Sequence, residues 1–299
     1  MRYGACLSSC PPSLAPPVTR LRCPVAIALS LVLAAPLLAQ RRHPTPPLPD
    51  PMQLLQRAIA NEKKMAAAQE RYECRVTDQI VETDKNGNVK KSSTEVNDQF
   101  FVNGISIEHL LSKNGQPLSP SAMKKEDERV MKETLKYSNQ GLAQKHTDRQ
   151  NQQVEDFLQA MMLVHGRRAI QNGRTVLLYD IVPNPQFKPG NINQRMATVL
   201  QGTASFDEKS GEVIDLNVRS VADVKLAGGL LANLHKGFWV HIHNHEEPDG
   251  VWLTDLAEGS GDARAALFFH PYFRFKETTG GCHLYNATAQ QIGPANPVK

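Results

Sequence analysis

Two segments in the second half of the chain alternate apolar and polar residues with a period of two. Their apolar positions are Ile214, Leu216 and Val218 in the first segment and Phe238, Val240 and Ile242 in the second. Successive side chains of a β-strand point to opposite faces of its sheet, so this pattern predicts strands with one apolar and one polar face. Half-buried strands of this kind are typical of antiparallel sheets.

The same period occurs near the start of the chain, after a helix. Apolar residues at helical spacing predict a helix over residues 52–69, and alternation then predicts strands over residues 72–82, 89–102 and 105–111. Asn-Gly pairs follow the first and the third of these strands. Asn-Gly readily adopts the positive φ angles of tight turns, so these pairs predict hairpins.

Two further helices are predicted between the early and the late strands. Ser119 is placed as an N-cap and Pro120 as the first residue of a charged helix that ends near residue 137. A second helix, predicted over residues 153–164, is more apolar and includes Phe157 and Met161. Its methionines suit an adaptable wall of a binding cavity, and plain core packing is the alternative. In total the chain predicts about ten strands and three helices.

The first 39 residues have the features of a secretory signal peptide. Arg20 and Arg22 precede an apolar run from residue 25 to residue 39. A membrane span needs about 20 apolar residues, so we expect a leader that is removed on export, with an uncleaved anchor as the alternative. The expected organisation is a signal peptide at 1–39, a Pro-rich tether at 40–51, one domain at 52–286 and a flexible tail at 287–299. The mature chain is expected in the periplasm or at the periphery of the outer membrane, with no membrane span.

The net charge changes when the leader is removed. The whole chain carries 34 basic and 30 acidic residues, and the leader holds three of the basic ones. The remaining chain is therefore close to neutral. This balance argues against nucleic-acid binding, which usually requires a dominant basic patch.

Two cysteines remain after the leader, Cys74 and Cys282. An even number of cysteines outside the cytoplasm favours a disulfide. The alternative is two separate thiols in β-strands.

Three histidines at alternate positions, His241, His243 and His245, are the strongest local candidates for chemistry. On a strand they share one face, and a His pair at this spacing can contribute to a zinc site. The alternative is a solvated polar face that happens to carry histidines. The sequence contains no nucleophile elbow, phosphate-binding loop or His-Glu-x-x-His motif. We therefore expect a protein that is not an enzyme and that has no cofactor.

Six segments resemble a secreted bacterial group within or beside the lipoprotein-sorting superfamily, whose half-barrels include LolA, LolB and the amino-terminal domain of RseB. They are ETDKNGNVK at 82–90, KNGQPLS at 113–119, EDER at 126–129, LQGTASFD at 200–207, GGLLANLHKG at 228–237 and DGVWL at 249–253. The resemblance implies an α+β fold in which a curved antiparallel sheet, an incomplete β-barrel of about ten or eleven strands, holds helices in its concave side. It carries over no catalytic residue.

The resemblance also implies a function, because the apolar inner face of such a half-barrel can accept acyl chains. The candidate cavity residues are Ile214, Leu216, Val218, Phe238, Val240, Ile242, Phe157 and Met161. We expect a lipid, a lipoprotein acyl chain or another apolar ligand in this cavity. The alternatives are an envelope module that docks or senses a protein partner, with its cavity filled by its own helices, and a metal-binding protein that uses the three histidines.

Overall fold

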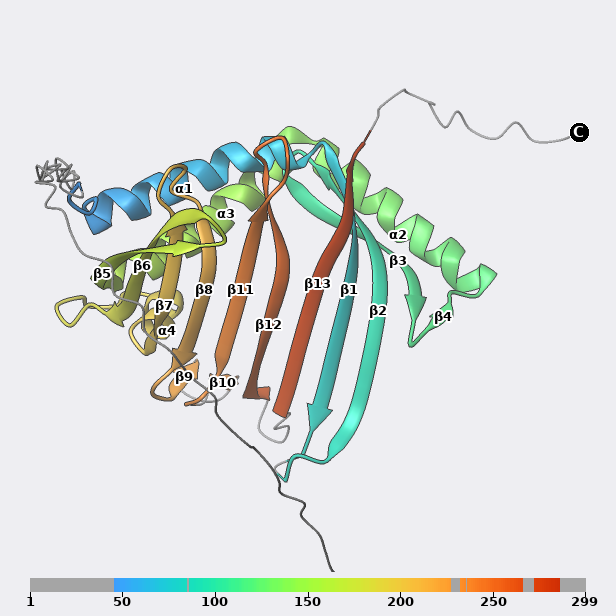
Figure 1. The fold of residues 1–299 in the computed structure, drawn as a ribbon. Helices are drawn as coiled ribbons and strands as arrows, with labels where there is room; N and C mark the ends of the chain where they lie inside the picture. Colours follow the sequence, from blue (N-terminus) through green and yellow to red (C-terminus); the bar gives the residue numbers. More distant parts are fainter. Residues whose placement is uncertain (1–45, 85, 227–231, 235, 266–271, 286–299) are drawn as a thin grey trace, which may run out of the picture. The chain divides into compact units, whose positions relative to one another are not determined.

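The computed structural model describes residues 46–84, 86–226, 232–234, 236–265 and 272–285. Within these residues the chain forms four helices and thirteen strands (Figure 1). The helices are α1 (Pro51–Gln69), α2 (Pro120–Ser138), α3 (Gln140–Gln159) and α4 (Ile192–Ala197). The strands are β1 (Tyr72–Thr83), β2 (Val89–Val102), β3 (Ile105–Lys113), β4 (Gln116–Pro117), β5 (Met161–Gln171), β6 (Arg174–Pro183), β7 (Leu200–Asp207), β8 (Val213–Ser220), β9 (Val224–Leu226), β10 (Ala232–Leu234), β11 (Trp239–Glu246), β12 (Trp252–Ala265) and β13 (Tyr272–Leu284). The predicted signal peptide and tail lie outside the described residues.

The strands form one open antiparallel sheet. Eleven of them follow the order β4-β3-β2-β1-β13-β12-β11-β8-β7-β6-β5, and the short β9 and β10 pair beside β12. The first strand, β1, pairs with both β2 and the last strand, β13, so the two ends of the domain meet inside the sheet (Figure 1). This arrangement confirms the predicted fold class, an α+β fold with an open, curved antiparallel sheet and helices.

Asn-Gly turns set the register of two hairpins. Asn114 (φ 52°) and Gly115 (φ 77°) connect β3 to β4, and Asn172 (φ 50°) and Gly173 (φ 77°) connect β5 to β6. Both residues of each pair occupy the left-handed region, which a tight hairpin requires and which Asn and Gly tolerate best. The turn at Asn114-Gly115 confirms the hairpin predicted there from the sequence.

The prediction of a helix over residues 153–164 is wrong at both boundaries. Helix α3 begins at Gln140 and ends at Gln159, and Met161 starts β5. Apolar spacing cannot distinguish the last turn of a helix from the first residues of a buried strand. Residues 161–164 form a strand because they pair with β6, with Met161 opposite Pro183 and Leu163 opposite Ile181. The local sequence does not contain this long-range information.

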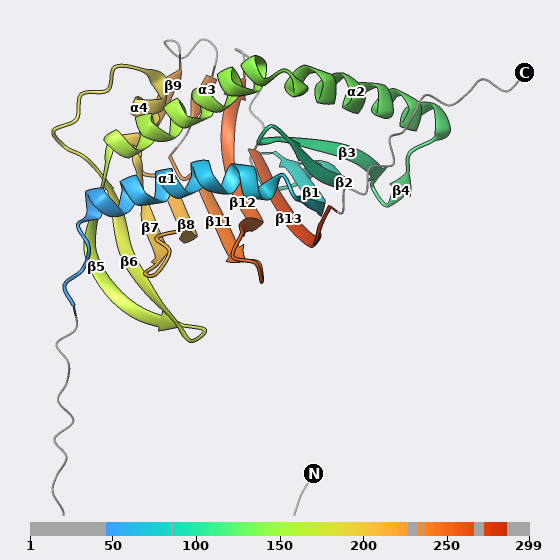
Figure 2. The same cartoon turned by 90° about the horizontal axis from the view of Figure 1, so that it is seen from above.

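One face of the sheet packs against helices and forms the main core; we call it the helix face. The first turn of α1 inserts Leu54 and Leu55 among apolar residues of β5, β6 and β7. Phe206 of β7 is the largest fully buried side chain there, with 1% of its surface exposed. Figure 2 shows α1 and α3 running across the strands at this end. Burial of apolar surface at about 25 cal/mol per Å² makes this the main source of stability.

A smaller core lies at the carboxyl end of α1. Tyr72, Cys74, Val251 and Leu253 are buried there, with Met65 of the helix packed against them. Cys74 and Cys282 form a disulfide that joins β1 to β13 across 208 residues of sequence. The bond therefore ties the first strand of the domain to the last, in the interior of the sheet.

β4 pairs with only the last residues of β3, so most of this edge of the sheet has no neighbouring strand among the described residues. Helix α2 packs beside this edge and protects it. Glu126 of α2 accepts a hydrogen bond from the backbone N–H of Leu110, at 2.9 Å. Arg129 of the same helix donates to the backbone carbonyl of Glu108. The helix therefore satisfies backbone groups that an open edge would expose to another strand.

Candidate functional site

The register of the central strands shows which of the candidate cavity residues share a face. Ile242 lies opposite Leu216, and Val240 lies opposite Val218. Leu216 and Val218 pack against the main core, so these four residues belong to the helix face. The predicted alternation of β8 and β11 therefore holds at these positions.

Three further candidates have different surroundings. Met161 packs against the main core from β5, not from a helix. Phe157 is half-buried near the end of α3. Ile214 does not join Leu216 on the helix face, because a register shift pairs Phe206 with Val213 and Ser205 with Asp215 and leaves Ile214 between them. Ile214 instead lines a cavity on the opposite face.

Apolar side chains continue along the helix face beyond the helices. Ile80 lies opposite Phe275, and the rings of Phe273 and Phe275 stack with centroids 6.5 Å apart. Val240 and Phe238 continue the same face across β12. We call Ile80, Phe238, Val240, Phe273 and Phe275 the apolar strip. Figure 1 shows the helices at the other end of these strands, so the strip lies away from them.

Glycines of β12 leave room for the aromatic rings of the apolar strip. A Cβ added to Gly259 would lie 2.6 Å from the ring of Phe275, and one added to Gly261 would lie 2.6 Å from the ring of Phe238. The two rings therefore lie directly over the backbone of β12. Ile80 is 48% exposed, and the two β13 phenylalanines are only half-buried.

A row of carboxyl groups separates the apolar strip from the buried core. Asp78 lies opposite Glu95 on one side and opposite Glu277 on the other. Burial and then the charge of Glu95 raise the pKa of Asp78, although a hydrogen bond from Asn97 at 2.8 Å opposes this. Burial and the charge of Asp78 raise the pKa of Glu277. Asp78 and Glu277 therefore take up protons more readily than ordinary carboxylates do.

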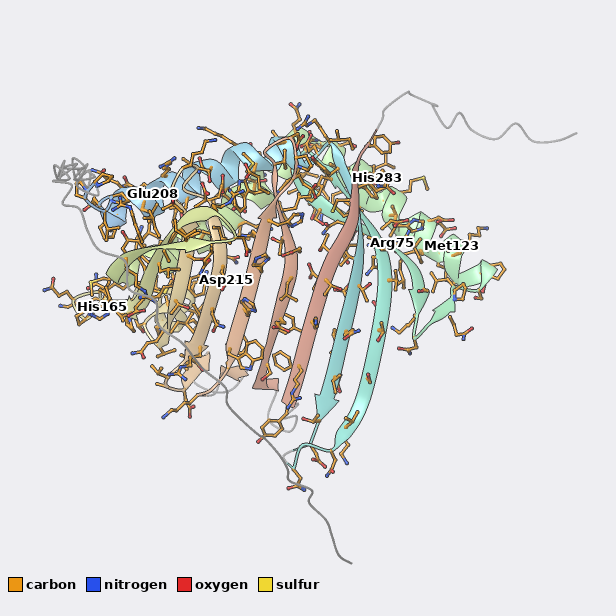
Figure 3. All side chains as sticks on the ribbon, viewed as in Figure 1. Arg75, Met123, His165, Glu208, Asp215 and His283 are labelled. Atoms are coloured by element: carbon orange, nitrogen blue, oxygen red, sulfur yellow. A yellow bond between two sulfur atoms is a disulfide. The ribbon has the colours of Figure 1, made fainter. Side chains whose placement is uncertain are left out.

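The opposite face, which we call the histidine face, carries His241, His243 and His245. Each imidazole has a carboxylate partner. His241 lies 3.0 Å from Asp215, which is labelled in Figure 3, and 3.3 Å from Glu258; His243 lies 2.6 Å from Asp255, and His245 lies 2.9 Å from Glu247. The hydrogen bond to Asp215 is the main cause of a raised pKa at His241. In the described part of the chain, no group of three or more His, Cys, Asp or Glu side chains is arranged to hold a metal ion.

A cavity of about 670 Å³ opens on the histidine face between β5, β6, β7, β8 and β11. Arg174 closes one side of it, with ion pairs to Asp207 at 3.0 Å and to Glu246 at 2.6 Å, and its guanidinium lies over the ring of Trp252 at 5.2 Å. The volume of the cavity falls within the range of about 300–1,000 Å³ that is typical of small-molecule sites.

Ser205 lies at the base of this cavity and is only 4% exposed. Its hydroxyl has no hydrogen-bond partner among the described residues. A serine nucleophile needs a base within hydrogen-bond reach, so the cavity holds no assembled serine–histidine pair. Sequence reasoning identified neither Ser205 nor Arg174 nor Trp252. Pairing across five strands, from β6 to β12, brings them together, and no local motif marks them.

Comparisons with known proteins give no match by sequence and a distant alignment by structure. No family model matches the chain, and no curated protein matches it. One solved structure that aligns is described as an outer membrane lipoprotein-sorting protein domain from Vibrio parahaemolyticus, at 10% identity and a TM-score of 0.34, over 81% of this chain and 96% of that one. Among the described residues, no helix has the length and apolar character needed to cross a membrane.

Proposed function

We propose that the protein is a non-enzymatic binding protein of the cell envelope that holds an acyl chain, of a lipid or a lipoprotein, on its apolar strip. The observation that carries this proposal is the exposure of Ile80 beside two half-buried phenylalanines, on the face that elsewhere forms the core. Apolar area left open on a core face is typical of a binding surface.

The energetics favour a long aliphatic ligand. Each CH₂ group removed from water contributes about 0.8 kcal/mol, so several methylenes laid along the strip suffice for micromolar binding with few polar contacts. The carboxyl row at Asp78 and Glu277 repels an anionic head group. We therefore expect the polar head of the ligand at the other end of the strip, away from the row.

The predicted signal peptide and the Cys74–Cys282 disulfide support an envelope location. Disulfides persist mainly in oxidising compartments such as the periplasm. The sequence resemblance to lipoprotein-sorting half-barrels supports the same location and the same class of ligand.

The test compares two exposed isoleucines on strands. Mature protein is stripped of lipid and titrated with a fluorescent long-chain fatty acid, as wild type, as Ile80→Asp and as Ile170→Asp. Ile80 belongs to the apolar strip, whereas Ile170 is 70% exposed at the far end of β5. A charge in the strip is expected to weaken binding more than tenfold, because the carboxylate must lose its water when the acyl chain of the ligand covers it. The Ile170 variant is expected to bind like wild type.

Mass spectrometry of the protein before lipid removal gives an independent check, and acyl-chain species are expected. Equal affinity of the two variants would remove the strip as the site. Absence of both co-purified lipid and fatty-acid uptake would leave the alternative of a protein-docking surface.

A further inference from the structure

The base of the cavity on the histidine face lies in one register row across five strands, and four of its five residues are polar. Arg167 of β5 lies opposite Leu178 of β6, and Leu178 lies opposite Ser205 of β7. Ser205 lies opposite Asp215 of β8, which in turn lies opposite His243 of β11. All five residues line the same cavity. Neighbouring strands are about 4.8 Å apart, so the row forms a continuous base.

Two groups in this cavity remain available to donate a hydrogen bond, the Ser205 hydroxyl and the Arg167 guanidinium. The Ser205 hydroxyl has no hydrogen-bond partner among the described residues. The Arg167 guanidinium likewise forms no hydrogen bond or ion pair in the described part of the chain, and it is exposed at the rim. A buried hydroxyl without a partner costs free energy, which a ligand would recover.

The acidic groups that line the cavity are already paired. Asp215 lies 3.0 Å from His241, whose raised pKa favours the charged imidazolium. Glu246 is paired with Arg174, which also holds Asp207. Arg174 is shared between two carboxylates, whereas Arg167 has no ion-pair partner in the described part of the chain and can therefore pair with an anion.

Part of the lining is apolar. Val176, Leu178 and Ile214 line the cavity together with the indole of Trp252, whereas Gln171, Asn172, Thr203 and Asn244 make other parts of it polar. A pocket with an apolar patch beside a few converging donors suits a small molecule that has an apolar body and one polar end.

We propose that this cavity is a second binding site, separate from the apolar strip, and that it takes a small organic acid. The anionic group pairs with Arg167 and accepts a hydrogen bond from Ser205, and the apolar body lies against Leu178, Ile214 and Trp252. The site is on the other face of the sheet, so it does not depend on the proposed acyl-chain function.

The fluorescence of Trp252 can report binding directly. The chain has two tryptophans, and a Trp239→Phe background leaves Trp252 as the single reporter. In this background the protein is titrated with benzoate and with benzamide, a neutral molecule of nearly the same shape. We expect a saturable change in fluorescence and about tenfold tighter binding of benzoate, the gain of one charge-assisted hydrogen bond.

Arg167→Gln is expected to abolish the preference for benzoate over benzamide, and Arg167→Lys is expected to keep part of it. Arg219→Gln is the matched control, because Arg219 of β8 is also an exposed arginine of the same sheet but does not line the cavity. Ser205→Ala is expected to weaken benzoate binding and to leave benzamide binding less affected. Uptake of the fluorescent fatty acid should be the same in Arg167→Gln and wild type, and benzoate binding should be the same in Ile80→Asp and wild type.

Three results would overturn the proposal. They are no saturable response to benzoate, equal affinity for benzoate and benzamide, and loss of the preference in Arg219→Gln as well as in Arg167→Gln. The last result would show a general effect of surface charge and not a site at Arg167.

Discussion

The helix face has two ends with the same sequence pattern and different surroundings. At one end Phe206, Leu177 and Leu54 are almost completely buried beneath α1. At the other end Ile80, Phe273 and Phe275 occupy equivalent alternating positions, but they are exposed or only half-buried. Alternation of apolar and polar residues therefore shows which face a side chain joins. It does not show whether another element covers that face.

The difference separates stability from the proposed binding. The covered end supplies the buried area that holds the domain together, whereas the apolar strip is expected to add little to stability and is the surface proposed for a ligand. Substitutions at the covered end should therefore lower stability more than binding, and substitutions in the apolar strip should lower binding more than stability.

The largest effect is expected from loss of the disulfide at the covered end. Cys74→Ser opens a crosslink that spans 208 residues of sequence. Loop-closure entropy for a loop of this size predicts a loss of about 4–5 kcal/mol in the free energy of unfolding, measured by urea denaturation. Cys74→Ser/Cys282→Ser should be no less stable than either single variant. A midpoint that is unchanged in reductant would contradict the prediction.

A pair of phenylalanine truncations compares the two ends directly. Phe206→Ala is expected to cost about 3–5 kcal/mol, because it leaves a cavity in the main core. Phe275→Ala removes a half-buried ring from the strip and should cost roughly 1 kcal/mol. Fatty-acid binding should show the reverse order, with the larger loss in Phe275→Ala. Equal destabilisation by the two truncations would mean that the strip is part of the core.

The smallest effect concerns a buried carboxyl at the covered end. Glu212 is 7% exposed, and burial followed by the charge of Glu62 raises its pKa to about 7. The folded protein therefore binds a proton that the unfolded chain releases near pH 4.5, so this group makes stability fall as the pH rises from about 4.5 to 7.

Glu212→Gln removes this dependence. The variant is expected to be more stable than wild type at pH 8, by about 1–3 kcal/mol, and close to wild type at pH 4.5. Thermal melts of both proteins across this range provide the measurement. A difference that is constant with pH would show that Glu212 is ionised throughout.

The sequence predicted much of the fold, because hairpin turns and alternation are local signals. The turn at Asn114-Gly115 and the shared face of Val240 and Ile242 follow from neighbours within a few residues. The prediction failed where pairing at long range overrode a local pattern. Met161 was predicted in a helix but lies in β5. Ile214 was predicted on the same face as Leu216, but a register shift places it elsewhere.

The candidate sites were less accessible to sequence reasoning. The histidines of β11 were visible as a motif, but their role as one wall of a cavity was not. The other walls come from strands that are far away in sequence, and Ser205 and Arg167 carry no local signature. The apolar strip was hidden for a different reason, since its residues resemble core residues in the sequence and differ only in that no described helix covers them.

The sequence by itself determined the alternation of faces, the positions of the tight turns and the presence of two cysteines, because these depend on side-chain chemistry and local backbone angles. The tertiary structure alone decided that β1 pairs with β13 and brings Cys74 to Cys282, which part of the apolar face α1 covers, and that Arg167, Ser205 and His243 share one row. Such decisions depend on contacts between residues tens to hundreds of positions apart, and the free energy of those contacts becomes available only when the whole sheet is assembled.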